Sequence, residues 1–579
     1  MSQQLKLRRG TTAEHANFTG AKAEVTVNTD TNTIVVHDGV TPGGNPLVDS
    51  KSLADPAKGA ALVARGAQFV GSVSGLRALS KLAASKHAFV AGYYTPGDGG
   101  GGAYYLDAAD TTSADNGGTI IVAADGGRWK LAQTSRISVK QFGAKGDGVT
   151  IDDAAINAAL AHAESVTGGA VHFPAGIYQV TNIGWDIETL SEHGRRVALT
   201  GDGPALSVIR SNTLANVNQG VMSVIARYET AMNSLIAGVE FSNLGFESQN
   251  GKGVSFRTQA LAYCYFENCH FNGGQFAFFG VGLVSSSFTN CRFSWAAETG
   301  LRLQKGVAFS YPNAITLTQC VIANNSKYGI YADNPGGIRM FGGSVEGNGA
   351  GAVGGTGAGV VLDHAGAVSA GTAIAAAFYG VYFEFNTGRA DVYMVHNNTS
   401  ENVSLTVADS SFACGGTTVT SDRILVEHLS RTALNVNVHG CNFQELSGYI
   451  PTVSSRYIKI NGPGTGARVG TGFGNYFNHV NSFPIPAQFR EMPRSNHARV
   501  ETQVGTTNAS GEVTFTFPAF ATPPDVVATP IDGGAGIVAV KCIGRTTTTA
   551  TFRAQSTAAA GGAWSPGAVM TIAATIIGT

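Results

Sequence analysis

The chain is poor in charge and lacks the features that take a protein to nucleic acid or into a membrane. Charged residues make up 13% of its 579 residues, and the net charge is −1. It therefore offers no bulk attraction for nucleic acid or for an anionic membrane. No apolar run approaches the roughly 20 residues that a spanning helix needs, and the first residues lack the apolar segment of a signal peptide. We expect neither nucleic-acid binding nor membrane insertion.

Signatures of metal binding and of phosphate binding are also missing. The seven cysteines are an odd number and show no CxxC spacing. The glycine run 97–102 is not followed by the helix and the Lys-Ser/Thr pair of a phosphate-binding loop. Cys269, Cys291, Cys320 and Cys441 fall near one position of a repeat and suit buried free thiols that fill space. We therefore expect no metal, no cofactor and synthesis in the reducing cytoplasm of a host cell.

What the chain does contain is glycine, 76 residues of it, and a short repeated phrase between about Gly238 and Leu446. Each copy is a turn residue, often a Cys, and then alternating apolar residues, and copies recur about every 20–40 residues. No helical periodicity survives across this region. The pattern predicts one coil of a parallel β-helix per copy, with one column of apolar residues stacked inside: Phe271, Phe293, Ile322, Val345, Phe383, Phe412 and Phe443.

A second phrase follows the first in five copies, beginning near Gly300, Gly329, Gly359, Asp391 and Arg423. It again alternates apolar with other residues, as the next strand of the same coil would. Two motifs that recur together in successive copies favour a solenoid over isolated strands.

The passage that opens the repeat contains Val139–Gly148, then an amphipathic segment with Ile156 and Leu160 on one face, then Gly168–Gly176. A helix here would cover the open end of a β-helix, whose apolar cross-section and strand edges need a cap. The sequence of this segment resembles the start of the β-helix domain in the pectate-lyase-like superfamily, as found in phage tailspikes. The resemblance implies a right-handed parallel β-helix and a homotrimer. The acids Asp147, Asp152 and Asp153 are better explained by turns and caps than by catalysis.

Residues 1–50 contain the phrase Leu5–His15 and two alternating strands around an Asp-Thr-Asn turn. They resemble the N-terminal module of the major tropism determinant family of phage receptor-binding proteins. The resemblance implies attachment to virion tail proteins, and hence a place in the virion. Residues 51–136 are expected to form a connector, 137–465 the β-helix, 466–497 a linker, and 498–579 a small antiparallel β-sandwich of short strands with Gly and Pro turns.

Outward columns of a β-helix line up acids from successive coils. Glu346 and Glu384 follow consecutive inward anchors, and Asp333 and Asp363 form a second pair. Because neighbouring strands lie about 4.7–4.9 Å apart, paired glutamates can reach the carboxyl separations of about 5–5.5 Å or 6.5–9.5 Å that glycosidases use. We therefore assign Glu346 and Glu384 as the first catalytic candidates and Asp333 and Asp363 as the second.

Aromatic and charged side chains near these acids are candidate sugar contacts, because aromatic rings stack on sugars and Arg pairs with carboxylates. The candidates are Arg302, Tyr331, Trp295, Glu298, Tyr382 and Tyr393. His270 and His396 become relevant if the reaction is β-elimination, which needs a base.

The resemblance to tailspikes and the paired acids predict a depolymerase that binds and cleaves bacterial surface polysaccharide, by hydrolysis with two carboxylates. A polysaccharide lyase is the alternative within that class. A receptor-binding fibre without catalytic activity is the alternative outside it.

Overall fold

The structure is a computed structural model. It describes residues 6–47, 67–82, 85–133, 135–166, 169–187, 197–226, 236–237, 239–306, 311–364, 374–397, 402–414, 422–429, 434–445, 458–461, 467–471, 476–478, 499–506, 512–517, 525–530, 537–557, 565–566 and 571–578. The chain divides into two compact units, Met1–Gln133 and Thr134–Thr579.

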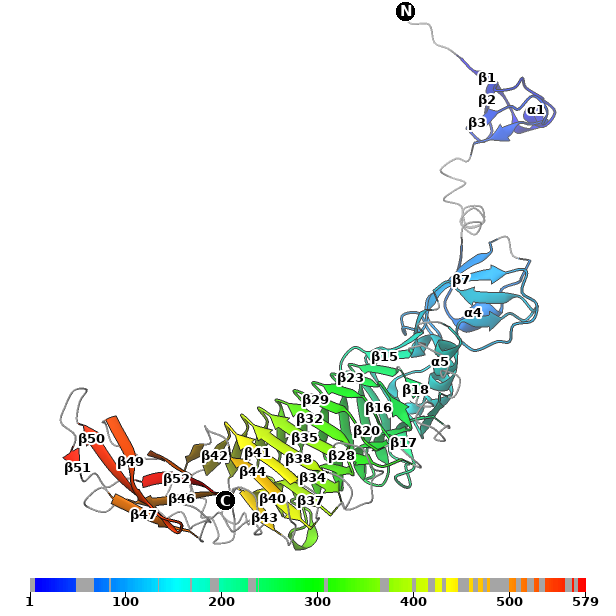
Figure 1. Cartoon of the computed structure of the whole chain (residues 1–579). Coiled ribbons are helices and arrows are strands. Elements are labelled where there is room, and N and C mark those ends of the chain that lie inside the picture. Colours follow the sequence, from blue (N-terminus) through cyan, green and yellow to red (C-terminus); the bar gives the residue numbers. More distant parts are fainter. Residues whose placement is uncertain are drawn as a thin grey trace, which may run out of the picture. The chain divides into compact units, whose positions relative to one another are not determined.

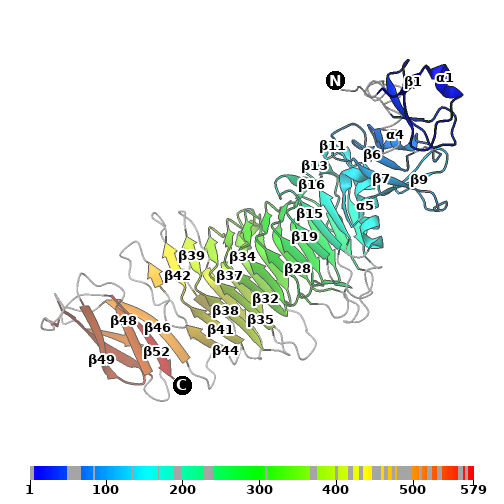
Figure 2. The same cartoon turned by 90° about the horizontal axis from the view of Figure 1, so that it is seen from above.

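The second unit contains three long parallel sheets, whose strands alternate in the chain so that each coil contributes one strand to each sheet (Figures 1 and 2). This is the predicted β-helix. The first sheet consists of β10 (Arg136–Ser138), β12 (Ala170–Phe173), β15 (Val197–Gly201), β19 (Val239–Ser242), β23 (Tyr265–Glu267), β26 (Ser287–Thr289), β29 (Ile315–Thr318), β32 (Gly337–Phe341), β35 (Ile374–Tyr379), β38 (Val403–Ala408), β41 (Leu434–His439) and β44 (Ala467–Thr471).

The second sheet consists of β11 (Asp147–Ile151), β13 (Gly176–Gln179), β16 (Ser207–Ser211), β20 (Gly245–Ser248), β24 (His270–Gly273), β27 (Arg292–Ser294), β30 (Val321–Ala323), β33 (Ser344–Glu346), β36 (Tyr382–Glu384), β39 (Ser411–Cys414), β42 (Asn442–Glu445) and β45 (Tyr476–Asn478). The third consists of β14 (Ile183–Asp186), β17 (Gly220–Ile225), β21 (Val254–Gln259), β25 (Phe276–Val281), β28 (Thr299–Gln304), β31 (Tyr328–Asp333), β34 (Ala358–His364), β37 (Ala390–His396), β40 (Asp422–His428) and β43 (Ile458–Asn461). A short side pair joins β18 (Ile236–Ala237) to β22 (Leu261–Ala262).

The predicted inner column is confirmed. Phe246, Phe271, Phe293, Ile322, Val345, Phe383, Phe412 and Phe443 are paired in register along the second sheet. The rings stack nearly parallel, as Phe383 and Phe412 do with centroids 4.8 Å apart. Each anchor of the column is at most 1% exposed. Stacking of neighbouring coils therefore buries what a single coil cannot.

The inside of the third sheet carries polar groups as well. His364, His396 and His428 are paired in register and have no exposed surface. At the turn before this sheet, a column of buried amides runs through Asn325, Asn348 and Asn386, each amide donating to a main-chain carbonyl one coil back. These amides fix the path of successive turns, because each also accepts or donates within the column.

Helix α5 (Asp153–Ser165) lies at the N-terminal end of the stack and buries Ile156, Ala159, Leu160 and Ala163. Asp152, which the sequence indicated as a turn or cap residue, does not cap the helix with its side chain. Asp152 is the N-cap residue, but its carboxylate accepts N–H groups of Lys145 and Gly146 instead of the helix's own. Asp147 and Asp153 likewise hold turns, accepting from Thr150 and Thr181. A one-turn 3-10 helix, η1 (Val139–Phe142), precedes β11.

Residues 6–47 fold around β1 (Arg8–Gly10), α1 (Thr12–Ala16), β2 (Val25–Asn28), β3 (Thr33–Val36) and β4 (Asn45–Pro46). Their centre is a chain of buried hydrogen bonds. The Gly20 N–H donates to His37 Nδ1 at 3.2 Å, so the proton of His37 is on Nε2, which donates to Thr26 Oγ1 at 2.9 Å. The Thr26 hydroxyl then donates to His15 Nε2 at 2.8 Å.

Residues 67–133 form one sheet of β5 (Gln68–Val70), β6 (His87–Val90), β7 (Gly102–Asp107), β9 (Arg128–Leu131) and β8 (Ile120–Val122), with α4 (Val73–Arg77) beside it. Tyr104 and Trp129 are buried in its core.

The C-terminal strands pair antiparallel in two sheets, as predicted for a sandwich. One contains β46 (Arg499–Thr506), β52 (Thr571–Gly578) and β48 (Asp525–Pro530), and the other β47 (Glu512–Thr516), β50 (Thr549–Thr557), β49 (Ile537–Arg545) and β51 (Ser565–Pro566). The β-helix extends further than expected, because β44 and β45 lie within 466–497, the range predicted as a linker. In the described part of the chain, no helix is long and apolar enough to cross a membrane.

Candidate functional site

The outer face of the second sheet brings the first predicted acid pair together. Glu346 ends β33, Glu384 ends β36, and the two residues are register partners on neighbouring strands. Their apolar predecessors Val345 and Phe383 point inward and are fully buried, so the alternation of the strand turns both carboxyls outward. Both acids are half-buried. The arrangement therefore presents two carboxyl groups side by side on an accessible face.

Tyr382 is the predicted sugar contact that lies beside this pair. It is two residues before Glu384 on β36 and is 37% exposed. Partial burial raises the pKa of the Tyr382 phenol, and the nearby carboxylates of Glu384 and Glu346 raise it further. The phenol is thus a protonated hydrogen-bond donor next to both acids.

The second acid pair lies on a different sheet. Asp333 and Asp363 are register partners on β31 and β34 of the third sheet. The Tyr331 hydroxyl donates to Asp363 Oδ2 at 2.5 Å, and the Arg302 guanidinium lies 4.0 Å from the centroid of the Tyr331 ring. Asn334 donates to Asp333 Oδ1 at 2.7 Å. Arg302, Tyr331, Asp333 and Asp363 therefore form one cluster, on a face that Glu346 and Glu384 do not share.

Two other predicted sugar contacts, Tyr393 and Glu298, form hydrogen bonds to other side chains of the β-helix. Tyr393 is only 6% exposed, and its hydroxyl accepts from Arg389 and donates to Glu427. Glu298 accepts from the Gln275 side chain at 3.0 Å, across neighbouring coils. Both residues thus have protein partners where they lie.

A hollow of about 260 Å³ on the second sheet was missed as a site from the sequence. Glu247, His270, Asn272, Arg292 and Trp295 contribute to its lining, from β20, β24, β27 and the turn after β27. His270 is a register partner of Arg292, and Glu247 of Asn272. Only the column position of these residues could have revealed the hollow, since the residues come from three separate coils.

The lining of the hollow contains one anion, Glu247, and one cation, Arg292. Glu247 is held by Arg210 at 2.8 Å, which leaves the Arg292 guanidinium without a carboxylate within salt-bridge distance among the described residues. Burial lowers the pKa of His270, and the charge of Arg292 lowers it further. His270 is therefore a neutral base beside a cation, a combination suited to a carboxylated ligand.

Trp295 rims this hollow in an unusual backbone conformation. Its φ is +59°, and its side chain is 63% exposed. A bulky L-residue in the left-handed region costs about 1–3 kcal/mol and persists where the surroundings or the function require it. Phe385, directly after Glu384, has the same features, with φ +51° and 43% exposure. Phe385 was not singled out from the sequence.

Among the described residues, no three His, Cys, Asp or Glu side chains converge as ligands of a metal ion.

Family models match four parts of the chain, the last two of which overlap. Residues 5–41 match the major tropism determinant N-terminal domain, and residues 69–134 the phage tail protein small four-stranded β-sheet domain. Residues 136–225 match the rhamnogalacturonase A/epimerase, pectate lyase-like model, and 197–370 the right-handed β-helix region. A tail fiber receptor-binding protein of Bordetella phage BPP-1 is 64% identical over 47 residues, which are 8% of this chain and 12% of that protein.

Solved structures agree in fold. Full-length tailspike protein 2 of an Escherichia coli O157:H7 bacteriophage matches with a TM-score of 0.52 at 13% identity, over 95% of this chain and 82% of that one. The enzymatically active domain of tailspike protein 4 of bacteriophage CBA120 matches with a TM-score of 0.50 at 14% identity, over 99% and 86%. In this chain, segments that match a major tropism determinant N-terminal domain and a phage tail β-sheet domain therefore precede a right-handed, pectate-lyase-like β-helix with the fold of solved phage tailspikes.

Proposed function

We propose that this chain is a tailspike depolymerase that binds a bacterial surface polysaccharide and hydrolyses its glycosidic bonds with Glu346 and Glu384. The observation that carries the proposal is the register pairing of these two glutamates on an outward face. The fold supports it, since two structural neighbours are described as enzymatically active tailspike domains.

The pair suits hydrolysis because the reaction needs an acid and a base on opposite sides of one bond. One carboxylic acid protonates the glycosidic oxygen as the bond to the anomeric carbon breaks. The other carboxylate takes a proton from the attacking water, or itself attacks the anomeric carbon. Neighbouring strands lie about 4.8 Å apart, so rotamer changes allow either the shorter or the longer carboxyl separation. Tyr382 can donate a hydrogen bond to the carboxylate that stays ionised.

A specific observation favours a second candidate, a lyase. The hollow places His270, a neutral base, beside Arg292, whose charge can offset a uronate carboxylate. In β-elimination, the base removes the proton α to the carboxylate, and the electrons of that C–H bond form a C=C bond. The C–O bond at the β carbon breaks, and the glycosidic oxygen leaves with its electrons. This site is separate from the glutamate pair, so variants can tell the two reactions apart.

The proposal is tested by incubating the whole protein with purified capsules and O-antigens. New reducing ends without absorbance from an unsaturated uronate indicate a hydrolase, and both signals together indicate a lyase. Binding without either signal indicates a non-catalytic receptor-binding fibre and contradicts the proposal. Glu346→Gln and Glu384→Gln should each reduce the rate of hydrolysis by about 10²–10⁴-fold, whereas full activity in both would remove the assignment.

We also propose that the chain is a homotrimer in the virion tail, attached through residues 1–50. Resemblance of this module to a phage receptor-binding protein supports the attachment. Analytical ultracentrifugation of the whole chain tests the trimer, and loss of virion incorporation without residues 1–50 tests the attachment.

A further inference from the structure

Five successive strands of the second sheet, β24 to β36, each have a residue in the left-handed conformation at their end or directly after it. In five successive coils these residues are Gly273, Trp295, Asn324, Gly347 and Phe385, with φ of 78°, 59°, 58°, 62° and 51°. Main-chain hydrogen bonds place them in one column: Trp295 donates to Ala323, Asn324 to Glu346, and Gly347 to Glu384, each one coil further along. We refer to this column as the corner column.

Gly and Asn occupy left-handed positions at little cost, whereas aromatic residues do not. Packing does not compensate for the two aromatic members, because Trp295 is 63% and Phe385 43% exposed. Folding alone would be served better by the Gly or Asn that the same column uses elsewhere. The aromatic rings are therefore explained by a ligand that contacts them from outside.

Position identifies the kind of ligand. Three strand steps separate the two aromatics, a distance of about 14 Å at the usual strand spacing. Glu346 and Glu384 come directly before Gly347 and Phe385, so the acid pair lies toward the Phe385 end. The Trp295 end borders the hollow with Arg292 and His270. Aromatic faces pack on the C–H faces of sugars, and Arg recognises carboxylates.

We infer that Trp295 and Phe385 are two stacking platforms for one acidic glycan chain that runs along the β-helix axis past Glu346 and Glu384, with a carboxylated sugar in the hollow at Arg292. This inference rests on the proposed function for the role of the acid pair. The assignment of Trp295 and Phe385 as stacking platforms depends only on the chain binding a glycan, and not on its cleaving one.

The test compares Trp295→Asn and Phe385→Asn with a matched control. Tyr263 is also an exposed aromatic at a left-handed position, with φ +54°, but it lies in the turn before the first sheet. Retention is measured on immobilised polygalacturonate, hyaluronate and alginate, and on the neutral polymers dextran and mannan. All proteins carry Glu346→Gln, so that the polymer is not consumed.

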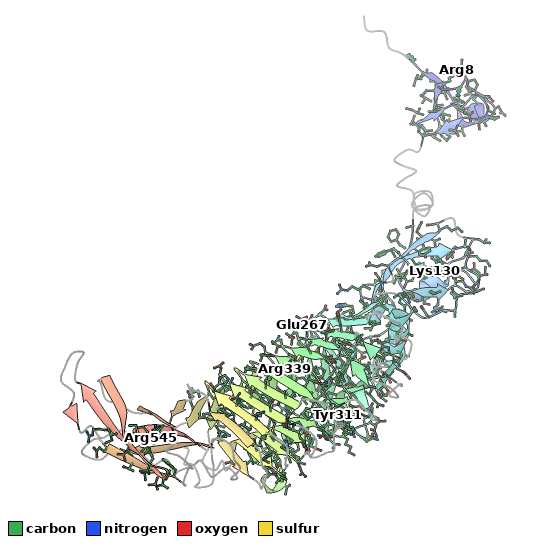
Figure 3. All side chains as sticks on the ribbon, viewed as in Figure 1. Arg8, Lys130, Glu267, Tyr311, Arg339 and Arg545 are labelled. Carbon is green, nitrogen blue, oxygen red and sulfur yellow. The ribbon has the colours of Figure 1, made fainter. Side chains whose placement is uncertain are left out.

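The expected result is retention on at least one acidic polymer and on neither neutral one. Trp295→Asn and Phe385→Asn should each weaken that retention tenfold or more, and their melting temperatures should equal or exceed that of the parent. Tyr263→Asn should leave retention unchanged. Arg292→Gln should weaken retention at low salt, unlike Arg339→Gln, which alters an exposed arginine on the first sheet (Figure 3).

Several results would overturn the inference: unchanged retention in both platform variants, lower melting temperatures that assign the rings to folding, retention on neutral polymers alone, or retention on none. The proposed function fails separately, if the protein with both glutamates releases no reducing ends from any capsule or O-antigen. Loss of retention in the platform variants without cleavage by the parent would leave the platforms standing in a non-catalytic fibre.

Discussion

Asp391 and Arg423 form an ion pair inside the β-helix, with Arg423 Nη1 donating to Asp391 Oδ2 at 2.7 Å and side-chain exposures of 6% and 0%. Asn386 donates to the other carboxylate oxygen at 2.9 Å, so the pair ends the column of buried amides. Burial raises the pKa of Asp391, and the charge of Arg423 acts in the opposite direction. Each charge is thus tolerated because of its partner.

We expect Asp391→Ala to lower the free energy of unfolding by about 3–5 kcal/mol, because it removes the carboxylate that offsets the charge of a buried guanidinium. Chemical denaturation followed by circular dichroism measures this. The double variant Asp391→Leu, Arg423→Leu should recover much of the loss. A cost below about 1 kcal/mol for the single variant would show that solvent reaches Arg423.

The glutamate pair makes a quantitative prediction about catalysis. Glu346→Gln and Glu384→Gln should each reduce the rate of glycosidic cleavage by about 10²–10⁴-fold, the usual contribution of a positioned acid or base. Glu267→Gln is the matched control, since Glu267 is an exposed glutamate on the first sheet (Figure 3). Reducing-end release measures the rate. An equal loss in the Glu267 variant would point to a general effect of charge.

The histidine column predicts acid sensitivity. Burial lowers the pKa of His364 to about 3 and that of His396 to about 4, and in each case the neighbouring histidine adds a smaller lowering. Neither ring nitrogen of His364 has a hydrogen-bond partner among the described residues. The unfolded chain therefore takes up protons first, and stability falls as the pH drops below about 6.5, continuing to fall toward the folded-state values.

For His364 alone, the loss between pH 7.5 and pH 5 should be about 2 kcal/mol. Thermal unfolding across this range measures it. The variant His364→Leu keeps the position apolar and should show a weaker pH dependence than the unchanged protein. Identical pH profiles would mean that His364 takes up its proton at the same pH in the folded and the unfolded chain.

The N-terminal module depends on one hydroxyl. Thr26→Val leaves the His15 and His37 Nε2 atoms without their shared partner and should cost about 2–6 kcal/mol, at about 1–3 kcal/mol for each buried unsatisfied group. Hydrogen exchange of the β2 amides, Val25–Asn28, reports local opening of the module. Thr26→Ser keeps the hydroxyl and should exchange as slowly as the unchanged chain, whereas equal exchange in the Val variant would contradict the network.

The inward half of the β-helix could be predicted because burial imposes a strict pattern. Phe271, Phe293 and Phe383 repeat after similar turn residues, so one column of the stack could be read before any coordinates. The same register placed Glu346 beside Glu384. The end of the β-helix was harder to predict, because β44 and β45 continue two sheets without the earlier turn phrase.

Much of the site could not be predicted, because outward residues obey no burial pattern. Arg302 and Tyr331 were predicted as sugar contacts, yet on the third sheet Tyr331 donates to Asp363 and Arg302 lies over the Tyr331 ring. The hollow combines Glu247, His270 and Arg292 from separate coils, and no local motif joins them. Phe385 was overlooked because a left-handed backbone angle leaves no mark on an aromatic residue in the sequence.

The separation between the inner stack and the corner column has an evolutionary consequence. An exchange at Trp295 or Phe385 alters a largely exposed side chain at one corner and does not replace any of the buried inward anchors. Substitutions can therefore accumulate in the corner column one coil at a time, while selection for folding acts on the buried interior. A lineage with this architecture can change what it recognises without first having to regain a stable fold.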